Sequence, residues 1–161
     1  MVAVAKTVGL TDLGSRFIKV DHAGEHGAVC IYSGQIFMAR LTAPHLVAEL
    51  TEFRAHERRH REIFRSELAR RGRPRCRSYW LCGLGGLTLG LITGLFGSGA
   101  IAATTVAVER VVLRHLEDQM SVLEAGDPSG AAAISAIVAD ERAHHDRHSC
   151  MRERASSGQR F

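Results

Sequence analysis

Apolar residues recur at steps of three and four along most of the chain, which is the spacing of amphipathic helices. β-Branched and aromatic residues are sparse and the 161 residues include only three prolines, so the composition favours helices over a many-stranded sandwich. We therefore expect one all-α domain over residues 1–161, with a four-helix bundle over about residues 18–154. The predicted helices span about residues 18–42, 45–71, 100–124 and 128–154.

Breaking and capping residues mark the ends of these helices. Pro44 should end the first helix, and Gly72 with Pro74 should end the second. Before the last helix, the carboxylate of Asp127 can cap the first turn, and Pro128 has the fixed φ that suits the first helical position. The sequence therefore predicts a sharp start for the last helix.

An uncharged segment of 31 residues, 78–108, follows the second helix. It is long enough to cross a bilayer, which takes about 20 residues. It also contains seven glycines, and the FGSG sequence at 96–99 should break a single helix. We therefore expect an apolar, Gly-rich insert over about residues 78–100, between the second and third helices of the bundle, and then a separate piece that enters the third helix.

The charge distribution bears on what this insert contacts. Residues 54–77 hold ten arginines and three glutamates, a local charge of +7, whereas the whole chain has a net charge of +4. Such a segment suits an anionic membrane surface or nucleic acid, or is a solvated helix face. Because it leads directly into the insert, we expect an interfacial membrane contact, with a transmembrane span or a core hairpin as alternatives. The expected membrane contacts are Tyr79, Trp80, Leu81, Leu84, Leu87, Leu91, Leu95 and Phe96.

The cysteines and the N-terminal residues bear on the compartment. Cys30, Cys76, Cys82 and Cys150 form neither a CxxC pair nor a dense framework, which indicates reduced thiols. The first 17 residues lack the apolar core and cleavage site of a secretory signal. We expect a peripheral protein on the cytoplasmic face of a bacterial inner membrane, or at the mitochondrial inner membrane if the source is eukaryotic and the chain is a mature form.

Each predicted helix carries one glutamate within its apolar stripe. In the second and fourth helices a histidine follows the glutamate three residues later, which places both side chains on one face. In each half of the chain the two glutamates are 32 residues apart, and the whole Glu…Glu-x-x-His pattern recurs at an offset of 84. The chain therefore resembles two helical hairpins with the same set of polar residues: Glu25, Glu57, His60, Glu109, Glu141 and His144.

These six residues predict a dinuclear metal site. A charge on an apolar stripe is costly to bury unless it is paired or bound to a cation. Four carboxylates and two imidazoles from four antiparallel helices are the ligand set of ferritin-like di-iron and di-manganese bundles. The absence of a thiolate argues against structural zinc or an iron–sulfur cluster, and iron is the expected metal. The alternative is a bundle whose acids are exposed or pair with one another.

Five sequence strings are similar to those of a known family. They are VDHAGEHGA, IYSGQ, ERRH, TVAVE and DERAHHD, within residues 17–148. They resemble the demethoxyubiquinone hydroxylase family of ubiquinone biosynthesis. The resemblance implies a ferritin-like, membrane-associated di-iron monooxygenase that hydroxylates a polyprenylated methoxy-benzoquinone with O2 and electrons from NADH. The iron ligands that it implies are the six residues already selected by spacing.

Several further residues lie near these ligands or depart from the family pattern. The family commonly has Tyr at the position of His26 and frequently an aromatic residue at that of Leu116, so substrate positioning or electron transfer can differ in this chain. Other polar residues either orient the imidazoles and relay protons or are solvent-exposed. This group consists of Asp21, Tyr32, His115, Asp140, His145, Asp146 and His148.

Two other functions use the same features. Bacterioferritin-like and rubrerythrin-like proteins share the ligand pattern, so a ferroxidase or peroxidase is one alternative, although the insert argues against a soluble cage subunit. A non-enzymatic helical protein that binds membranes or nucleic acid through its arginines is the other. We favour the hydroxylase, with a polyprenyl quinone and a membrane surface as partners, a homodimer or a lipid-presenting protein as further candidates, and no nucleic acid.

Overall fold

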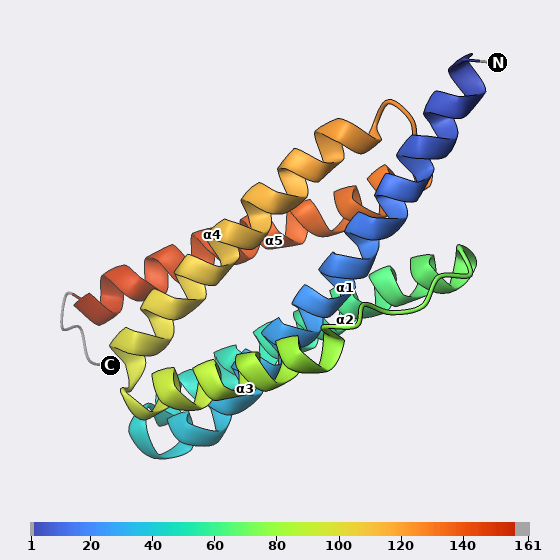
Figure 1. The fold of residues 1–161 in the computed structure, drawn as a ribbon. Coiled ribbons are helices and arrows are strands. Elements are labelled where there is room, and N and C mark those ends of the chain that lie inside the picture. The colour runs from blue at the N-terminus through green and yellow to red at the C-terminus, as the bar shows by residue number, and fades with distance from the viewer. Residues whose placement is uncertain (1, 157–161) are drawn as a thin grey trace.

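The computed structural model describes the backbone of residues 2–156 and the side chains of residues 11–142. In this part of the chain five α-helices and one short 3-10 helix are present and no strand is found (Figure 1), which confirms the all-α prediction. The elements are α1 (Val2–Thr42), η1 (Pro44–Leu46), α2 (Val47–Arg70), α3 (Tyr79–Leu95), α4 (Ser98–Leu123) and α5 (Pro128–Ser156).

The long helices form two hairpins. Figure 1 shows α2 running back beside α1, and α5 running back beside α4. The remaining helix, α3, lies along α1 and runs in the same direction, because Gly86 of α3 is next to Gly27 and Gly94 is next to Met38. The insert between the second and third helices of the bundle is therefore an added helix on the outside of α1.

The helix ends follow the sequence signals closely. Gly72 has a φ of +61°, and the N–H groups of Gly72 and Arg73 donate to the carbonyls of Ala69 and Leu68, which closes α2. At the start of α5 the N–H of Gly130 donates to Asp127 Oδ1 at 3.1 Å. The predicted cap is therefore confirmed.

Two boundaries need comment. The break within the uncharged segment is confirmed, since Gly97 has a φ of +82° and separates α3 from α4. The first helix begins at Val2 instead of about residue 18. Residues 2–17 contain no proline to stop a helix that has already formed, so the helix extends beyond the residues that pack in the bundle.

Close packing between α1 and α3 explains much of the glycine content. A Cβ atom on Gly90 would lie 2.1 Å from the carbonyl oxygen of Ile31, and one on Gly86 would lie 2.3 Å from that of Gly27. No side chain fits at such distances. The two backbones are therefore in direct contact, which is the arrangement that small residues permit between helices.

The interior contains two separate apolar clusters. One joins α1, η1, α2 and the start of α4 and contains Tyr32, Ile36, Ala39, Ala43, Leu46, Leu50, Phe53, Ile101 and Ala102. The other joins α1, α2, α4 and α5 and contains Ile18, Phe64, Leu68, Leu116, Leu123, Ile134, Ile137 and Val138. Along α1, α2 and α4 the buried glutamate lies between the two clusters, and along α5 Glu141 follows the residues of the second cluster.

The outer face of α3 is apolar and exposed. Its exposed large apolar residues are Trp80, Leu81, Leu84, Leu87, Leu89, Ile92 and Leu95, followed by Phe96. Leu91 is half-buried. Among the described residues, no helix combines the length and apolar character needed to cross a membrane.

Tyr79 departs from the expected membrane face. Its side chain is only 9% exposed, because its ring stacks on that of His26 with centroids 4.0 Å apart. It also stacks on His22 at 5.0 Å. The predicted contact at Tyr79 is thus corrected to a packing role between α1 and α3.

Candidate metal centre

Four helices each place one glutamate in the interior. Glu25 comes from α1, Glu57 from α2, Glu109 from α4 and Glu141 from α5, and each is at most 4% exposed. His60 lies one turn after Glu57 on the same face of α2 and is also buried. These polar residues are buried because they lie on the same helix faces as the apolar residues that pack in the core.

The side chains of four of these residues converge on one point. Single ligand atoms of Glu25, Glu57, His60 and Glu141 all lie within 4.8 Å of one another. His60 Nδ1 lies 2.9 Å from Glu141 Oε1, 3.8 Å from Glu57 Oε2 and 3.9 Å from Glu25 Oε2. Three carboxylates and an imidazole at this separation are an arrangement that can hold a metal ion.

Glu109 belongs to the same cluster from the α4 side. The hydroxyl of Tyr32 donates to Glu109 Oε1 at 2.7 Å, and both residues are buried. Burial, the charges of Glu109 and Glu57 and the hydrogen bond to Glu109 raise the pKa of Tyr32 well above its ordinary value. Tyr32 therefore stays protonated and fixes the orientation of the Glu109 carboxylate.

His60 is held from its other nitrogen by Asp140. His60 Nε2 lies 3.2 Å from Asp140 Oδ2, while Nδ1 faces Glu141. Burial opposes the charged imidazole, but hydrogen bonds with Glu141 and Glu57 outweigh it and raise the pKa of His60 to about 10. A carboxylate behind a histidine in this way is common for metal-ligating imidazoles.

The carboxylates destabilise one another's charge. Burial and the nearby charges of Glu57 and Glu141 raise the pKa of Glu25 well above its ordinary value. Burial also raises the pKa of Glu109, together with its hydrogen bond to Glu141. A cation bound here would remove this repulsion, and its binding would be coupled to loss of protons. The donors are carboxylates and imidazole, which fit iron or manganese.

The other predicted residues are distributed differently. The side chains of His144, His145, Asp146 and His148 lie outside the described residues, although the backbone there continues α5. His115 is exposed on α4. Of the candidates near the metal site, Tyr32 and Asp140 therefore contact the cluster, and the α5 histidines stay predictions.

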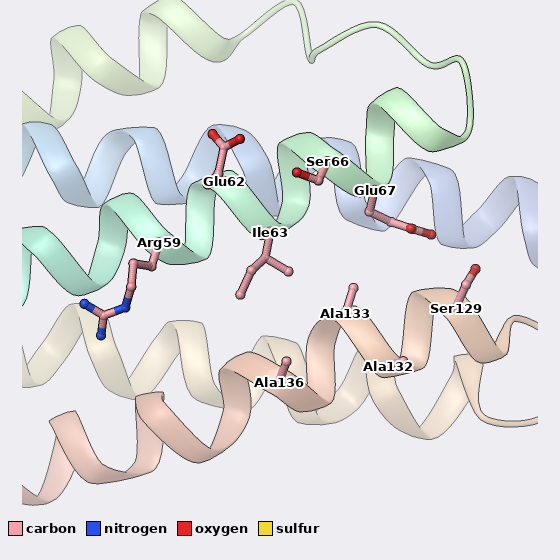
Figure 2. A pocket seen from close by; sticks show the side chains of 9 residues that line it. All are labelled: Arg59, Glu62, Ile63, Ser66, Glu67, Ser129, Ala132, Ala133 and Ala136. Carbon is pink, nitrogen blue, oxygen red and sulfur yellow. The ribbon is translucent and has the colours of Figure 1, made fainter.

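A groove separates α2 from α5 beside the cluster (Figure 2). It has a volume of about 600 Å³, and Ile63, Ala133 and Ala136 point into it. The contacts of His60 with Asp140 and Glu141 lie beyond one end, and those of Arg71 with Asp127 and Ser129 lie at the other. The two helices are thus joined by polar contacts on either side of an open stretch.

Comparison with known proteins identifies the family. Residues 12–157, most of the chain, match the family described as "Ubiquinone biosynthesis protein COQ7". The chain belongs to the COQ7 family. This confirms the resemblance inferred from the sequence strings, and the converging acids described above lie within the matched residues.

Several curated proteins are similar to this member of the COQ7 family. The "3-demethoxyubiquinol 3-hydroxylase" of Rhodospirillum rubrum is 37% identical, with 81% of this chain and 61% of that protein covered. The mouse "NADPH-dependent 3-demethoxyubiquinone 3-hydroxylase, mitochondrial" is 34% identical with the same coverage. The yeast "5-demethoxyubiquinone hydroxylase, mitochondrial" is 38% identical over 65% of this chain and 45% of that protein. The chain spans about three fifths of the first two relatives.

The two departures from the COQ7 pattern have clear positions in the structure. Leu116 is a fully buried residue of the second apolar cluster. His26 stacks on Tyr79, and its Nδ1 lies 3.3 Å from the guanidinium of Arg61. Burial, Arg61 and Arg75 lower the pKa of His26, so the neutral ring accepts the hydrogen bond.

The sequence placed Asp21 near the proposed ligands but did not reveal its pairing with Gln119. Gln119 Nε2 donates to Asp21 Oδ1 at 3.0 Å, and both residues are buried. Burial raises the pKa of Asp21 to about 7, although the hydrogen bond from Gln119 opposes this. Asp21 is four residues before Glu25, and that helical spacing was the only signal for it.

Proposed function

We propose that this chain is a di-iron monooxygenase that hydroxylates the ring of a polyprenylated demethoxyubiquinone with O2 in ubiquinone biosynthesis. The convergence of Glu25, Glu57, His60 and Glu141 in the interior carries the proposal. Membership of the COQ7 family supports the pathway, and the names of the relatives from R. rubrum and mouse support the substrate.

The residues that would hold two irons come from all four helices of the two hairpins. They supply carboxylate and imidazole donors, and the raised pKa values of Glu25 and Glu109 favour binding of a cation over a cluster of free charges. When bound, iron would supply the electrons that activate O2. The proposed ligands are Glu25, Glu57, His60, Glu109, Glu141 and His144.

The residues around these ligands would position them. Donation from His60 Nε2 to Asp140 leaves Nδ1, the nitrogen that faces Glu141, as the metal-ligating atom. The hydroxyl of Tyr32 holds Glu109 in one orientation. The apolar clusters on both sides exclude water, which strengthens every charge interaction within the centre.

We further propose that a reduced nicotinamide nucleotide supplies the electrons. The relatives from mouse and Dictyostelium discoideum are named NADPH-dependent, whereas the sequence resemblance implied NADH. Parallel assays with NADH and NADPH at equal concentration decide between the two nucleotides for this chain.

We propose that the protein acts at a membrane surface, with the exposed face of α3 in the lipid interface. A polyprenyl tail is insoluble in water, and the exposed leucines with Trp80 form a continuous apolar face. The same face would suit a second copy or a lipid-presenting protein. For a bacterial source the proposed location of the protein is the cytoplasmic face of the inner membrane. The mitochondrial inner membrane is the counterpart in eukaryotes, and the mouse and yeast relatives are named mitochondrial.

Iron content and turnover test the proposed function together. After anaerobic loading with ferrous iron and desalting, we expect about two irons per chain by elemental analysis. With O2, a reductant and a short-chain demethoxyubiquinone, we expect a hydroxylated quinone detected by mass spectrometry. Well-folded protein without bound iron would overturn the metal centre. Loaded protein that oxidises iron or reduces peroxide, and leaves the quinone unchanged, would favour the ferroxidase or peroxidase alternative.

A further inference from the structure

A second polar site lies where α2 ends and α3 begins. It is a cavity of about 520 Å³ between α1, α2 and the connection that follows α2. Its lining is strongly basic. The residues that matter for the argument are His22, Arg61, Arg65, Arg73, Arg75 and Tyr79.

Two of the four arginines in this cavity are already neutralised. Arg65 pairs with Glu62, and Arg73 pairs with Asp12 at 2.7 Å. Arg61 and Arg75 form no ion pair with a carboxylate in the described part of the chain. The cavity therefore holds two positive charges that the described side chains do not balance.

The two unbalanced arginines are nevertheless held in place. Arg61 Nη1 lies 3.3 Å from His26 Nδ1. The guanidinium of Arg75 lies 5.2 Å from the ring centre of Tyr79 and 4.9 Å from that of Trp80. Stacking of this kind holds a guanidinium group in one position without neutralising its charge. The geometry is that of an ordered cationic site and not of freely solvated side chains.

A buried histidine completes the cavity wall. His22 is 4% exposed, and its Nδ1 has no hydrogen-bond partner among the described residues. Burial lowers the pKa of His22, and Arg61, His26, Arg65 and Arg75 lower it further. The positive charges therefore act on the same space, and a buried polar atom without a partner borders it.

We propose that this cavity binds a phosphate group, with Arg61 and Arg75 donating hydrogen bonds to its oxygens. Guanidinium groups match the oxygens of phosphate in geometry and charge. The concave shape suits a single group on a small molecule or headgroup better than an extended backbone. The phosphate can belong to a soluble molecule or to a phospholipid headgroup, since the cavity adjoins the exposed Trp80 at the start of α3.

Trp80 provides a direct probe, because it is the only tryptophan in the chain and Arg75 lies over its ring. The full-length, iron-loaded protein is titrated in phosphate-free buffer with inorganic phosphate. A parallel titration uses phosphatidylcholine vesicles with and without phosphatidylglycerol. We expect a saturable change in Trp80 emission in one or both series. Arg61→Gln should weaken it about tenfold or more, as expected for loss of a charge-assisted hydrogen bond.

Arg58→Gln is the matched control, since it removes the same charge from an exposed position of α2 outside the cavity. It should change the affinity by less than about twofold. Circular dichroism checks the fold of each variant, and Arg75→Gln, at an exposed position, repeats the test if Arg61→Gln does not fold.

The outcomes separate the two phosphate sources. A response to inorganic phosphate that Arg61→Gln abolishes supports the site with a soluble ligand. A response only to vesicles with phosphatidylglycerol that Arg61→Gln abolishes supports it with a headgroup. No response in either series, or equal loss in Arg61→Gln and Arg58→Gln, overturns the proposal.

Discussion

At the scale of single residues, Glu141 has the most demanding environment in the centre. It is 1% exposed, and its Oε1 lies 2.9 Å from His60 Nδ1. A carboxylate enclosed so completely is costly unless its charge is compensated. The protonated ring of His60 compensates this charge in the metal-free protein, and a bound cation would do so in the proposed centre.

Replacement of this carboxylate tests the assignment. In Glu141→Ala we expect iron content to fall from about two per chain to about one or fewer, because a ligand of the proposed site is lost. Elemental analysis after ferrous loading measures it. Glu52→Ala, which removes an exposed carboxylate of α2, should keep the wild-type content. Full iron content in Glu141→Ala would contradict the proposed ligand set.

Asp21 predicts a pH dependence of stability. Its pKa is raised by burial to about 7, so the folded state keeps a proton that the unfolded chain releases above about pH 4. Stability should therefore fall as pH rises from about 4 to about 7, by up to about 1.4 kcal/mol per pH unit from this group.

The variant Asp21→Asn isolates this effect, because it cannot titrate and still accepts a hydrogen bond from Gln119. Urea unfolding of the metal-free proteins at about pH 5 and about pH 8 gives the comparison. The loss of stability between the two pH values should be smaller in Asp21→Asn. Equal losses would show that the side chain of Asp21 is ionised in the folded protein.

Sequence spacing predicted the acids but not their partners. Glu25, Glu57, Glu109 and Glu141 interrupt regular apolar stripes, so their burial followed from helical periodicity alone. The bond between Asp21 and Gln119 joins positions 98 residues apart on α1 and α4. This hydrogen bond forms only at one position of α1 along the axis of α4. Side-chain packing sets that position once both helices have formed, so local sequence patterns do not predict it.

At the scale of elements, the packing of α3 on α1 is the least ordinary feature. Gly86 and Gly90 allow direct backbone contact, while the opposite face of α3 remains apolar and exposed. The position of α3 therefore depends on the absence of side chains on one face and is independent of the leucines on the other.

A pair of alanine substitutions tests this dependence. Gly90→Ala places a Cβ 2.1 Å from the backbone oxygen of Ile31, so we expect it to destabilise the protein by about 1–3 kcal/mol. Gly85→Ala meets nothing within 4 Å and should stabilise it slightly, by about 0.5–1 kcal/mol. Urea unfolding measures both. Equal stability of the two variants would contradict the close contact.

Local signals in the sequence account for most helix boundaries. Pro128, Gly72 and Gly97 each force or favour one backbone conformation, so the ends near them could be predicted. The start of α1 carried no such signal. The seven glycines indicated a break near residue 97, and their use as a packing surface required knowledge of which helix lies opposite.

At the scale of the whole molecule, the exposed apolar face of α3 is adjacent to the basic cavity. Trp80 belongs to the first and is stacked by Arg75 of the second. Apolar and cationic groups side by side are typical of surfaces that bind anionic membranes. The arrangement suggests one orientation of the protein on a lipid surface.

Vesicle flotation tests the apolar part of this surface. We expect Leu84→Glu to weaken membrane binding strongly, because a charge enters the proposed interface. Val111→Glu changes a similarly exposed apolar residue of α4 and should bind as the wild type does. Equal flotation of both variants, or wild-type protein that stays wholly in solution, would contradict the proposed membrane face.

The division of the interior into two apolar clusters affects how the protein opens. The two apolar clusters have no residue in common, and the acids lie between them. In the metal-free protein each cluster can act as a separate cooperative unit, so amides near Leu50 and near Ile137 should exchange with deuterium at different rates. Bound metal would link the four helices across the gap. The two exchange rates would then approach a single value, and the bundle would open as one unit.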